Sequence, residues 1–435
     1  MRKWRRRRLR FGVLAVIAAA VAGCGSASAT TGGWPPLSKG PVHLNVLMVS
    51  DIVYSDSQID QMTHAFEVLH PNIKVSTEFV AYNALHQKII TDQIGGSGIY
   101  DVVVMDNIWP AEFASAGIAR NLKGRIPASY LTDTLPGVWQ GSTYHGGIYG
   151  VPWGGMAVKH LFYNKKMLAE AGIQTPPRTW NQLETDAETL KAKHIVQYPF
   201  VASWGQCECA IADWTQMAGA FGAKKLMNEN GTPAFNTGGG LASLTFMRTM
   251  MAKGLANPGS LSFDEEDVNS TMESGQAAMA LNWDYFYPED NSPADSKVAG
   301  QIALTISPGE GSVPTSGVDG DLSLAVTKSS AHPAEALEYA LYMSSETVQN
   351  EGAAVAPPMW KASYKDPKVT DTDPPVYAAY EKLGNHIIER PQVPYYSALS
   401  AALQVAIQKA LAGSETPKQA LDSVAAQIPS LKKNG

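Results

Sequence analysis

Three apolar runs separated by two helical patterns constrain the fold of this chain more than any other feature. The first and third runs are almost continuously apolar, which is typical of buried strands, and the second alternates as a half-buried strand does. The stretches between them carry apolar residues at helical spacing. This order predicts an α/β domain with a largely parallel sheet. The strands are expected at residues 42–49, 73–80 and 101–105, and the helices at 59–69 and 85–94.

The length of the chain indicates two domains. At 435 residues it exceeds the size at which a single hydrophobic core stops growing. Its hydrophobic content of 45% and its charged content of 17% are ordinary for a globular protein. The proline and glycine residues are scattered, so no segment is expected to be fibrous.

The first 23 residues have the pattern of a lipoprotein signal peptide. Seven basic residues and no acidic ones precede an apolar run at residues 11–22, which is too short to span a bilayer. The run ends in Val21-Ala22-Gly23-Cys24, which resembles the bacterial lipobox. A lipid on Cys24 and a flexible tether over residues 24–41 predict anchoring to the cell membrane on its extracytoplasmic face. An ordinary signal peptide cleaved elsewhere is the alternative.

Removal of the signal peptide makes the chain strongly acidic. Residues 1–23 hold seven of the 34 basic residues and none of the 40 acidic ones, so 27 basic residues remain and the net charge becomes −13. An acidic protein of this kind is not expected to bind nucleic acid. The charge says little about a neutral ligand.

Two further cysteines, Cys207 and Cys209, leave two states open. An exported protein favours a disulfide, whereas a bridge between residues two apart is tight and strained. A metal site would need more ligands, and no histidine or further cysteine lies near them in the sequence. We expect no metal and no cofactor.

Five sequence motifs occur in an order that resembles a known family. They are Gly-Val-Pro-Trp at 150–153, followed by Tyr-Asn-Lys; the run LHPNIKV at 69–75; YDVVVMD at 100–106; SGQAAM with a later tryptophan at 274–283; and the tail at 390–421. Together with the lipobox they resemble the bacterial extracellular solute-binding proteins of ABC sugar importers, of the maltose- and trehalose-binding type. The individual motifs are loose, but their joint order is specific.

The resemblance implies a periplasmic-binding-protein type II fold, with two α/β lobes, a hinge of several strands and a ligand cleft between the lobes. The N-terminal lobe would comprise residues 42–153 and 322–356. The C-terminal lobe would comprise residues 154–321 and 357–435.

The same resemblance implies a binding protein without catalytic activity. It would capture a carbohydrate, in particular a disaccharide or oligosaccharide like trehalose or maltose, by lobe closure. As a monomer, it would deliver this ligand to ABC permease subunits and their ATPase. One alternative is a binding protein for another solute, such as a glycerophosphodiester. Another is an exported glycoside hydrolase that uses Asp106 and Asp284, although the sequence lacks a recognisable catalytic signature.

A sugar cleft combines polar groups for hydroxyls with aromatic rings for the apolar faces of the sugar. In an open α/β sheet these groups are expected at the carboxyl ends of strands. On this basis, and from positions that the resemblance marks, the predicted ligand-binding residues are Asp51, Tyr54, Asp106, Asn107, Trp109, Trp153, Trp204, Trp283, Asp284, Tyr285, Gly320, Asp321, Arg390 and Tyr396.

Three of these predictions have structural alternatives. Asp106 has the position of a helix N-cap, because Pro110 follows it closely. Arg390 could form a surface ion pair, and Trp204 could pack in the core of the second lobe. Trp283 is the residue that we favour most as a stacking platform.

Overall fold

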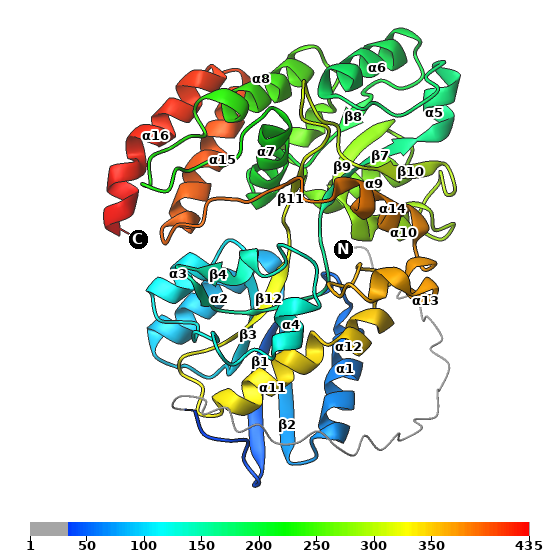
Figure 1. Ribbon diagram of the computed structural model, residues 1–435. Coiled ribbons are helices and arrows are strands. Elements are labelled where there is room, and N and C mark those ends of the chain that lie inside the picture. The colour runs from blue at the N-terminus through cyan, green and yellow to red at the C-terminus, as the bar shows by residue number, and fades with distance from the viewer. Residues whose placement is uncertain (1–33, 435) are drawn as a thin grey trace. The chain divides into compact units, whose positions relative to one another are not determined.

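Two β-sheets organise the part of the chain that the computed structural model describes, residues 34–434 (Figure 1). The first sheet has the order β2-β1-β3-β12-β6. Strand β1 is parallel to both β2 and β3, whereas β12 is antiparallel to β3 and β6. The strands are β1 (Val42–Val49), β2 (Ile73–Val80), β3 (Val102–Asp106), β6 (Val151–Trp153) and β12 (Leu322–Val326).

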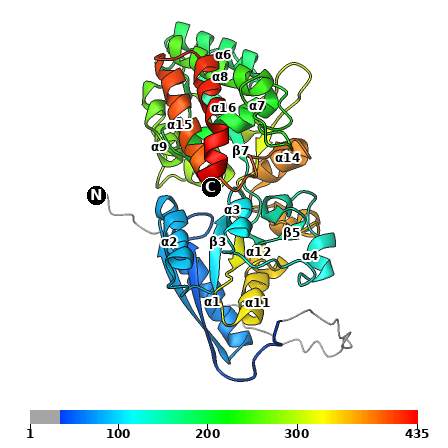
Figure 2. The ribbon, with the colours of Figure 1, turned by 90° about the vertical axis from the view of Figure 1, so that its left-hand side faces the viewer.

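Helices cover both faces of the first sheet, and together they form what we call the first lobe. Figure 2 shows α2 and α11 on opposite sides of β3. Helix α1 begins where Ser55 accepts a hydrogen bond from Gln58 N and Gln58 reaches back to Ser55 N. The remaining elements are α1 (Asp56–Leu69), α2 (Tyr82–Gly95), α3 (Pro110–Ser115), α4 (Ala128–Thr132), β4 (Thr143–Tyr144), β5 (Gly147–Ile148), α11 (Pro333–Met343) and α12 (Glu346–Glu351).

The second sheet has the order β10-β7-β9-β8, and with the helices packed on it forms the second lobe. Strand β7 is antiparallel to β9 and β10, and β8 is parallel to β9. The strands are β7 (Lys159–Asn164), β8 (Phe200–Val201), β9 (Met279–Trp283) and β10 (Ile302–Thr305). The remaining helices are α5 (Lys165–Glu170), α6 (Trp180–Ala192), α7 (Glu208–Ala220), α8 (Gly238–Ala252), α9 (Glu265–Glu273), α10 (Tyr287–Asp290), α13 (Pro367–Thr370), α14 (Pro374–Leu383), α15 (Tyr396–Ala412) and α16 (Pro417–Asn434).

The chain crosses between the lobes at segments that lie side by side. After β6, the backbone N–H of Met156 donates to the carbonyl oxygen of Pro357 at 2.7 Å, which joins two crossings. Gly155 has a φ of +77°, and a Cβ there would lie 2.4 Å from that same oxygen, so the approach needs glycine. A third crossing contains β11 (Gly317–Val318), which pairs with β13 (Ile387–Ile388).

The predicted α/β class and the strand–helix order are confirmed. Strands β1 and β2 have the predicted bounds, and β3 begins one residue later than expected. Within residues 34–434, no helix combines the length and apolar character that a bilayer crossing requires. The predicted signal peptide and Cys24 lie outside the described residues.

Candidate ligand-binding site

A cavity of about 370 Å³ lies where loops of both lobes and two crossings meet. This volume is within the range of small-molecule sites. As predicted for an open α/β sheet, the first lobe contributes residues at or just after the carboxyl ends of β1, β2 and β3. The residues that line the cavity are Ile52, Val53, Tyr82, Asn83, Asp106, Trp153, Gly154, Gly155, Ala157, Gly205, Gln206, Cys207, Glu208, Cys209, Ala212, Ser262, Asp264, Glu265, Glu266, Trp283, Tyr285, Gly320, Leu322 and Arg390.

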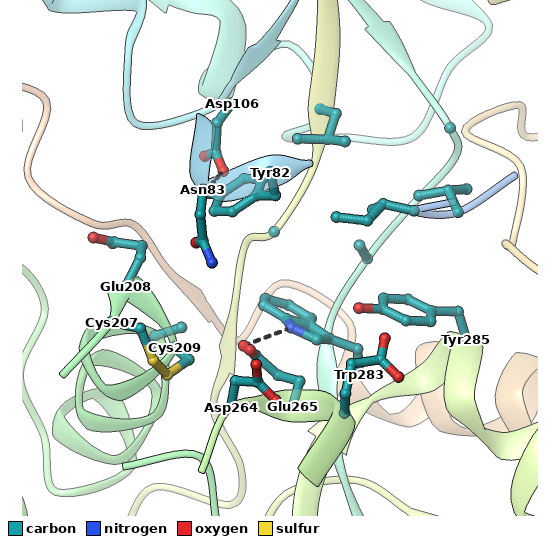
Figure 3. A pocket seen from close by; sticks show the side chains of 18 of the residues that line it. Tyr82, Asn83, Asp106, Cys207, Glu208, Cys209, Asp264, Glu265, Trp283 and Tyr285 are labelled. Carbon is teal, nitrogen blue, oxygen red and sulfur yellow. Dashed lines mark hydrogen bonds between the residues drawn. A yellow bond between two sulfur atoms is a disulfide. The ribbon is translucent and has the colours of Figure 1, made fainter. Parts of the chain in front are cut away.

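Aromatic rings from both lobes face this cavity. Figure 3 shows Tyr82 of the first lobe on one side and Trp283 and Tyr285 of the second lobe on the other. Trp283 ends β9, and Trp153 ends β6. Flat rings beside polar groups are the surfaces that suit the C–H faces of a polyhydroxylated ligand.

Three neighbours from three segments fix the indole of Trp283. Its Nε1 donates to Glu265 Oε1 at 3.1 Å (Figure 3). The Nζ of Lys159, the residue paired with Trp283 across β7 and β9, lies 5.0 Å from the ring centroid. A Cβ added to Gly320 would lie 2.4 Å from the ring, so the indole rests directly on this crossing. These contacts hold the indole of Trp283 in one position in the cavity wall.

Beneath this indole Lys159 is fully buried and forms a charged cluster. Its Nζ lies 2.7 Å from Asp213 Oδ1, 3.1 Å from Glu265 Oε1 and 2.9 Å from Ser203 Oγ. Burial raises the pKa of Asp213 to about 6, against the opposing effect of the Lys159 ammonium. A buried cation with three hydrogen-bonding partners fixes the positions of these partners but adds little net stability.

Arg390 joins the two lobes at the edge of the cavity. Its Nη1 donates to Glu208 Oε1 at 3.0 Å in the first turn of α7. Its Nη2 donates to Asp106 Oδ1 at 3.2 Å, to Asn107 Oδ1 at 2.7 Å and to the carbonyl of Asp319 at 3.2 Å. Only Nε has no partner among the described residues. Most of the hydrogen-bond donors of Arg390 are thus used within the protein, where they connect the two lobes.

Glu208 is the partner of Arg390 in the second lobe, and in the sequence it lies between two cysteines. Tyr396 and Ser400 of α15 both donate hydrogen bonds to its carboxylate. Burial raises the pKa of Glu208, and the Arg390 guanidinium opposes this rise. Cys207 and Cys209 are joined as a disulfide in the cavity wall (Figure 3).

We expect removal of this disulfide by the double change of Cys207 and Cys209 to serine to lower stability only modestly. Because the bridge closes a very short loop, the chain-entropy model gives about 1.5 kcal/mol. Urea unfolding of the wild-type chain in oxidised and reduced form, beside the serine variant, measures this. Equal losses in the reduced chain and the variant are expected, and a loss above about 4 kcal/mol would contradict a purely local role.

Six of the predicted ligand-binding residues line the cavity, and eight do not. The six are Asp106, Trp153, Trp283, Tyr285, Gly320 and Arg390. In the loop after β1, the cavity is lined by Ile52 and Val53 instead of Asp51 and Tyr54. Asp51 is exposed and caps the first turn of α1, while Tyr54 is buried edge-to-face behind Trp153 at 5.8 Å.

Asn107 and Asp321 support the cavity wall from behind. Asn107 Nδ2 donates to the carbonyl of Asp319 at 2.9 Å, and Asp321 Oδ1 accepts from Ala157 N at 2.8 Å. Both side chains therefore connect a lobe to a crossing. Tyr396, whose hydroxyl bonds to Glu208, is also buried outside the cavity.

Two predicted tryptophans pack in the lobes. Trp109 stacks on Phe113 with ring centroids 5.7 Å apart, in the core of the first lobe. Trp204 packs against Phe200 at 5.9 Å in the core of the second lobe, which was its alternative interpretation. Their hydrophobic surface is thus used for stability.

Of the two carboxylates considered for a hydrolase, only Asp106 lines the cavity. Asp284 is buried and accepts a hydrogen bond from Tyr380 OH at 2.5 Å. Burial raises the pKa of Asp284 to about 7. Asp106 accepts hydrogen bonds from Tyr82 OH at 2.6 Å and from Arg390. Because Asp284 lies outside the cavity, Asp106 and Asp284 are not placed on two sides of one bond of a ligand.

Two structural alternatives are wrong. Asp106 is not a helix N-cap, because α3 begins after Trp109, which has no side-chain capping bond. Arg390 does not form a surface ion pair, because its side chain is 3% exposed and its carboxylate partners are also largely buried. The close sequence distance of Asp106 to Pro110 had made the cap plausible, but the strand end turns the carboxylate toward the cavity.

Several cavity residues were not predicted. Tyr82 and Asn83 follow β2, so the strand-end argument applied to β1 and β3 would have found them. Glu265 and Glu266 lie in the acidic first turn of α9. No local pattern marks Glu208, because its role depends on Arg390, which is distant in sequence.

Acidic side chains close to β9 have raised pKa values, which predicts a pH dependence of stability. Burial raises the pKa of Asp290 to about 8 and of Glu273 to about 7, with neighbouring acids adding to the effect, as burial does for Asp284. Between their unfolded and folded pKa values these groups bind more protons in the folded state, so stability falls as pH rises. Burial lowers the pKa of His160 to about 3, which opposes this trend only below about pH 6.5.

We therefore expect the apparent melting temperature to fall by a few degrees between about pH 5 and about pH 8. This corresponds to a loss of more than about 1 kcal/mol in the free energy of unfolding. Differential scanning calorimetry over this range measures it. Asp290→Asn should flatten the curve and raise stability at the alkaline end. A curve that rises with pH in both proteins would contradict the raised pKa values.

Two lobes, several crossings and a cavity at the strand ends define a class of protein, namely one that holds a small ligand between hinged lobes. A family model described as bacterial extracellular solute-binding protein matches residues 51–350. The chain therefore belongs to the family of bacterial extracellular solute-binding proteins.

Known proteins are similar to this chain over almost its whole length. The mannitol-binding protein of Pseudomonas aeruginosa is 25% identical over 413 residues, which cover 89% of this chain and 92% of that protein. The structure is similar to maltose-bound MalE3 of T. maritima, with a TM-score of 0.80, 25% identity and coverage of 90% and 100%. It is also similar to an ABC transporter solute-binding protein from Agrobacterium radiobacter K84 in complex with ribitol, with a TM-score of 0.78, 25% identity and coverage of 91% and 100%. The fold is thus the predicted type II periplasmic-binding-protein fold.

Proposed function

We propose that this protein is the substrate-binding component of an ABC importer and that its ligand is a carbohydrate or polyol. The observation that carries this proposal is the fixed Trp283 platform, which faces polar side chains of the first lobe across a cavity of about 370 Å³. Aromatic faces and carboxylates together suit a polyhydroxylated ligand. The names of the similar proteins support the same ligand class, because they mention mannitol, maltose and ribitol.

Lobe closure is the proposed mechanism of capture. The ligand contacts Tyr82 and Asn83 of the first lobe and Trp283 and Tyr285 of the second. Because these contacts are complete only when the lobes approach, bound ligand favours the closed state. The proposed division is residues 42–153 with 322–356 for one lobe and 154–321 with 357–435 for the other. No bond in the ligand is broken in this cycle.

The proposed place of action is the extracytoplasmic face of the cell membrane. A lipid on Cys24 holds the protein there as a monomer, and the closed form docks on the permease subunits, whose ATPase drives import. Among neutral sugars, a maltose- or trehalose-like disaccharide is the ligand that we favour. Metabolic labelling with an alkyne fatty acid tests the anchor, since Cys24→Ala should abolish labelling.

A thermal-shift panel tests the ligand class. The full chain in mild detergent is heated with trehalose, maltose, longer glucans, monosaccharides, mannitol, ribitol and glycerophosphocholine. A ligand that binds only the folded state raises the melting temperature by mass action. We expect a rise with a sugar or polyol, and its loss in Trp283→Ala. A rise with glycerophosphocholine alone would contradict the proposal.

A further inference from the structure

The cavity has an unusual charge balance. Five carboxylates line it, and Arg390 is the only basic residue among the described residues of its wall. The five are Asp106, Glu208, Asp264, Glu265 and Glu266. A neutral sugar needs donors as well as acceptors, so this excess of carboxylates calls for an explanation.

The basic groups near the cavity neutralise only part of this charge. Arg390 is shared between Asp106 and Glu208, at 3.2 and 3.0 Å, so this group keeps one net negative charge. Lys159 is likewise shared between Glu265, at 3.1 Å, and the buried Asp213, at 2.7 Å. Each cation therefore faces two carboxylates.

Asp264 and Glu266 have no ion-pair partner in the described part of the chain. Asp264 has a structural reason to be there, because it caps α9 by accepting from Asp267 N at 3.1 Å. Glu266 makes no such bond, although the start of a helix favours its charge. Partial burial and the neighbouring acids raise the pKa of Glu266 to about 7.

Two of the five carboxylates, those of Asp264 and Glu265, lie beside the aromatic platform. Figure 3 shows Asp264 and Glu265 next to Trp283, with Tyr285 on the same side of the cavity. Aromatic rings together with carboxylates attract a ligand ammonium by cation–π and Coulomb interactions. Lys159 lies 5.0 Å from the Trp283 ring, but its two carboxylate partners offset its charge. The second-lobe wall is therefore suited to a positively charged group.

We propose that the preferred ligand is an amino-bearing sugar or polyol, whose protonated amine lies against Trp283 and the Glu265–Glu266 carboxylates. The hydroxyl groups of this ligand use Asn83 and the first-lobe wall. This inference rests on the proposed carbohydrate-binding function and refines it. Anionic ligands such as uronic acids or phosphodiesters are disfavoured by the same charges.

Matched pairs of ligands test this proposal. Isothermal titration calorimetry compares glucitol with glucamine, in which one hydroxyl is replaced by an ammonium, and cellobiose with the glucosamine disaccharide of the same linkage, in which two are replaced. Near neutral pH we expect the amine to bind at least about tenfold tighter in a pair that binds. The preference should shrink toward about 1 M salt, because screening weakens the Coulomb attraction at the partly exposed mouth.

A variant locates the effect. Glu266→Gln should lower the ratio of amine to hydroxyl affinity several-fold, whereas Glu273→Gln, a change on the same helix outside the cavity wall, should leave the ratio as it is. Equal affinity for amine and hydroxyl ligands would overturn this inference while the carbohydrate role stands. Failure of both members of every pair, and of the neutral panel, would overturn both.

Discussion

Replacing Arg390 with methionine is expected to lower the free energy of unfolding by about 3–5 kcal/mol. The change keeps a long apolar stem but leaves Asp106 and Glu208 buried without a cation. Removing one partner of a buried ion pair costs far more than the net contribution of the pair, because an uncompensated charge remains. Ligand affinity should fall as well, since Asp106 and Glu208 both line the cavity.

Lys253→Met provides a matched control for this prediction. Lys253 also lies between two carboxylates, those of Glu184 and Glu188 at 2.5 and 2.6 Å, but this group is at the surface. Water solvates the carboxylates that remain, so we expect a loss of about 0–1 kcal/mol. Urea unfolding of both variants, followed by circular dichroism, gives the comparison.

Adding Asp106→Asn to the Arg390→Met variant should recover part of the lost stability, because it removes one of the two uncompensated charges. The Asp106→Asn change alone should be destabilising, since it breaks the same connection. If Asp106→Asn lowers stability in the wild-type chain but raises it in the Arg390→Met variant, the double-mutant cycle establishes the ion pair between the two side chains. Equal losses in Arg390→Met and Lys253→Met would contradict the role of Arg390 as the connection between lobes.

The elements of the fold could be predicted because they depend on local patterns. Strands β1 and β2 were predicted with their bounds, since each is a run of apolar or alternating residues that gives way to another pattern at its end. The strand-end argument also placed Asp106 and Trp283 at the cavity. Such predictions need only the periodicity of a segment and the direction of its strand.

The roles of Arg390 and Trp109 could not be predicted in this way. The sequence around Arg390 marks a polar position, but its partners Asp106 and Glu208 lie far away along the chain. Trp109 closely follows the end of β3 and Trp283 ends β9, yet one stacks on Phe113 in the core and the other faces the cavity. That difference depends on which neighbours fill the space around each ring, which only the packed lobes define.

Gly320→Ala is expected to weaken ligand binding at least about tenfold, or about 1.4 kcal/mol, with a much smaller effect on stability. The φ of Gly320 is not in the left-handed region, so alanine is compatible with the backbone. The new methyl group would lie 2.4 Å from two ring atoms of Trp283, which forces the indole to move. Moving the ring breaks its alignment with the bound ligand and strains its hydrogen bond to Glu265.

A double-mutant cycle separates this steric effect from any effect on the hinge. In a Trp283→Leu background there is no indole for the methyl group to displace, so Gly320→Ala should cost little additional affinity. The affinity is measured by calorimetry with whichever sugar or polyol gives the largest thermal shift. If Gly320→Ala instead weakens binding equally in both backgrounds, its effect arises from the crossing. There the backbone N–H of Gly320 donates to the carbonyl oxygen of Ala157 at 3.0 Å. In that case Trp283 would not be the platform on which the ligand lies.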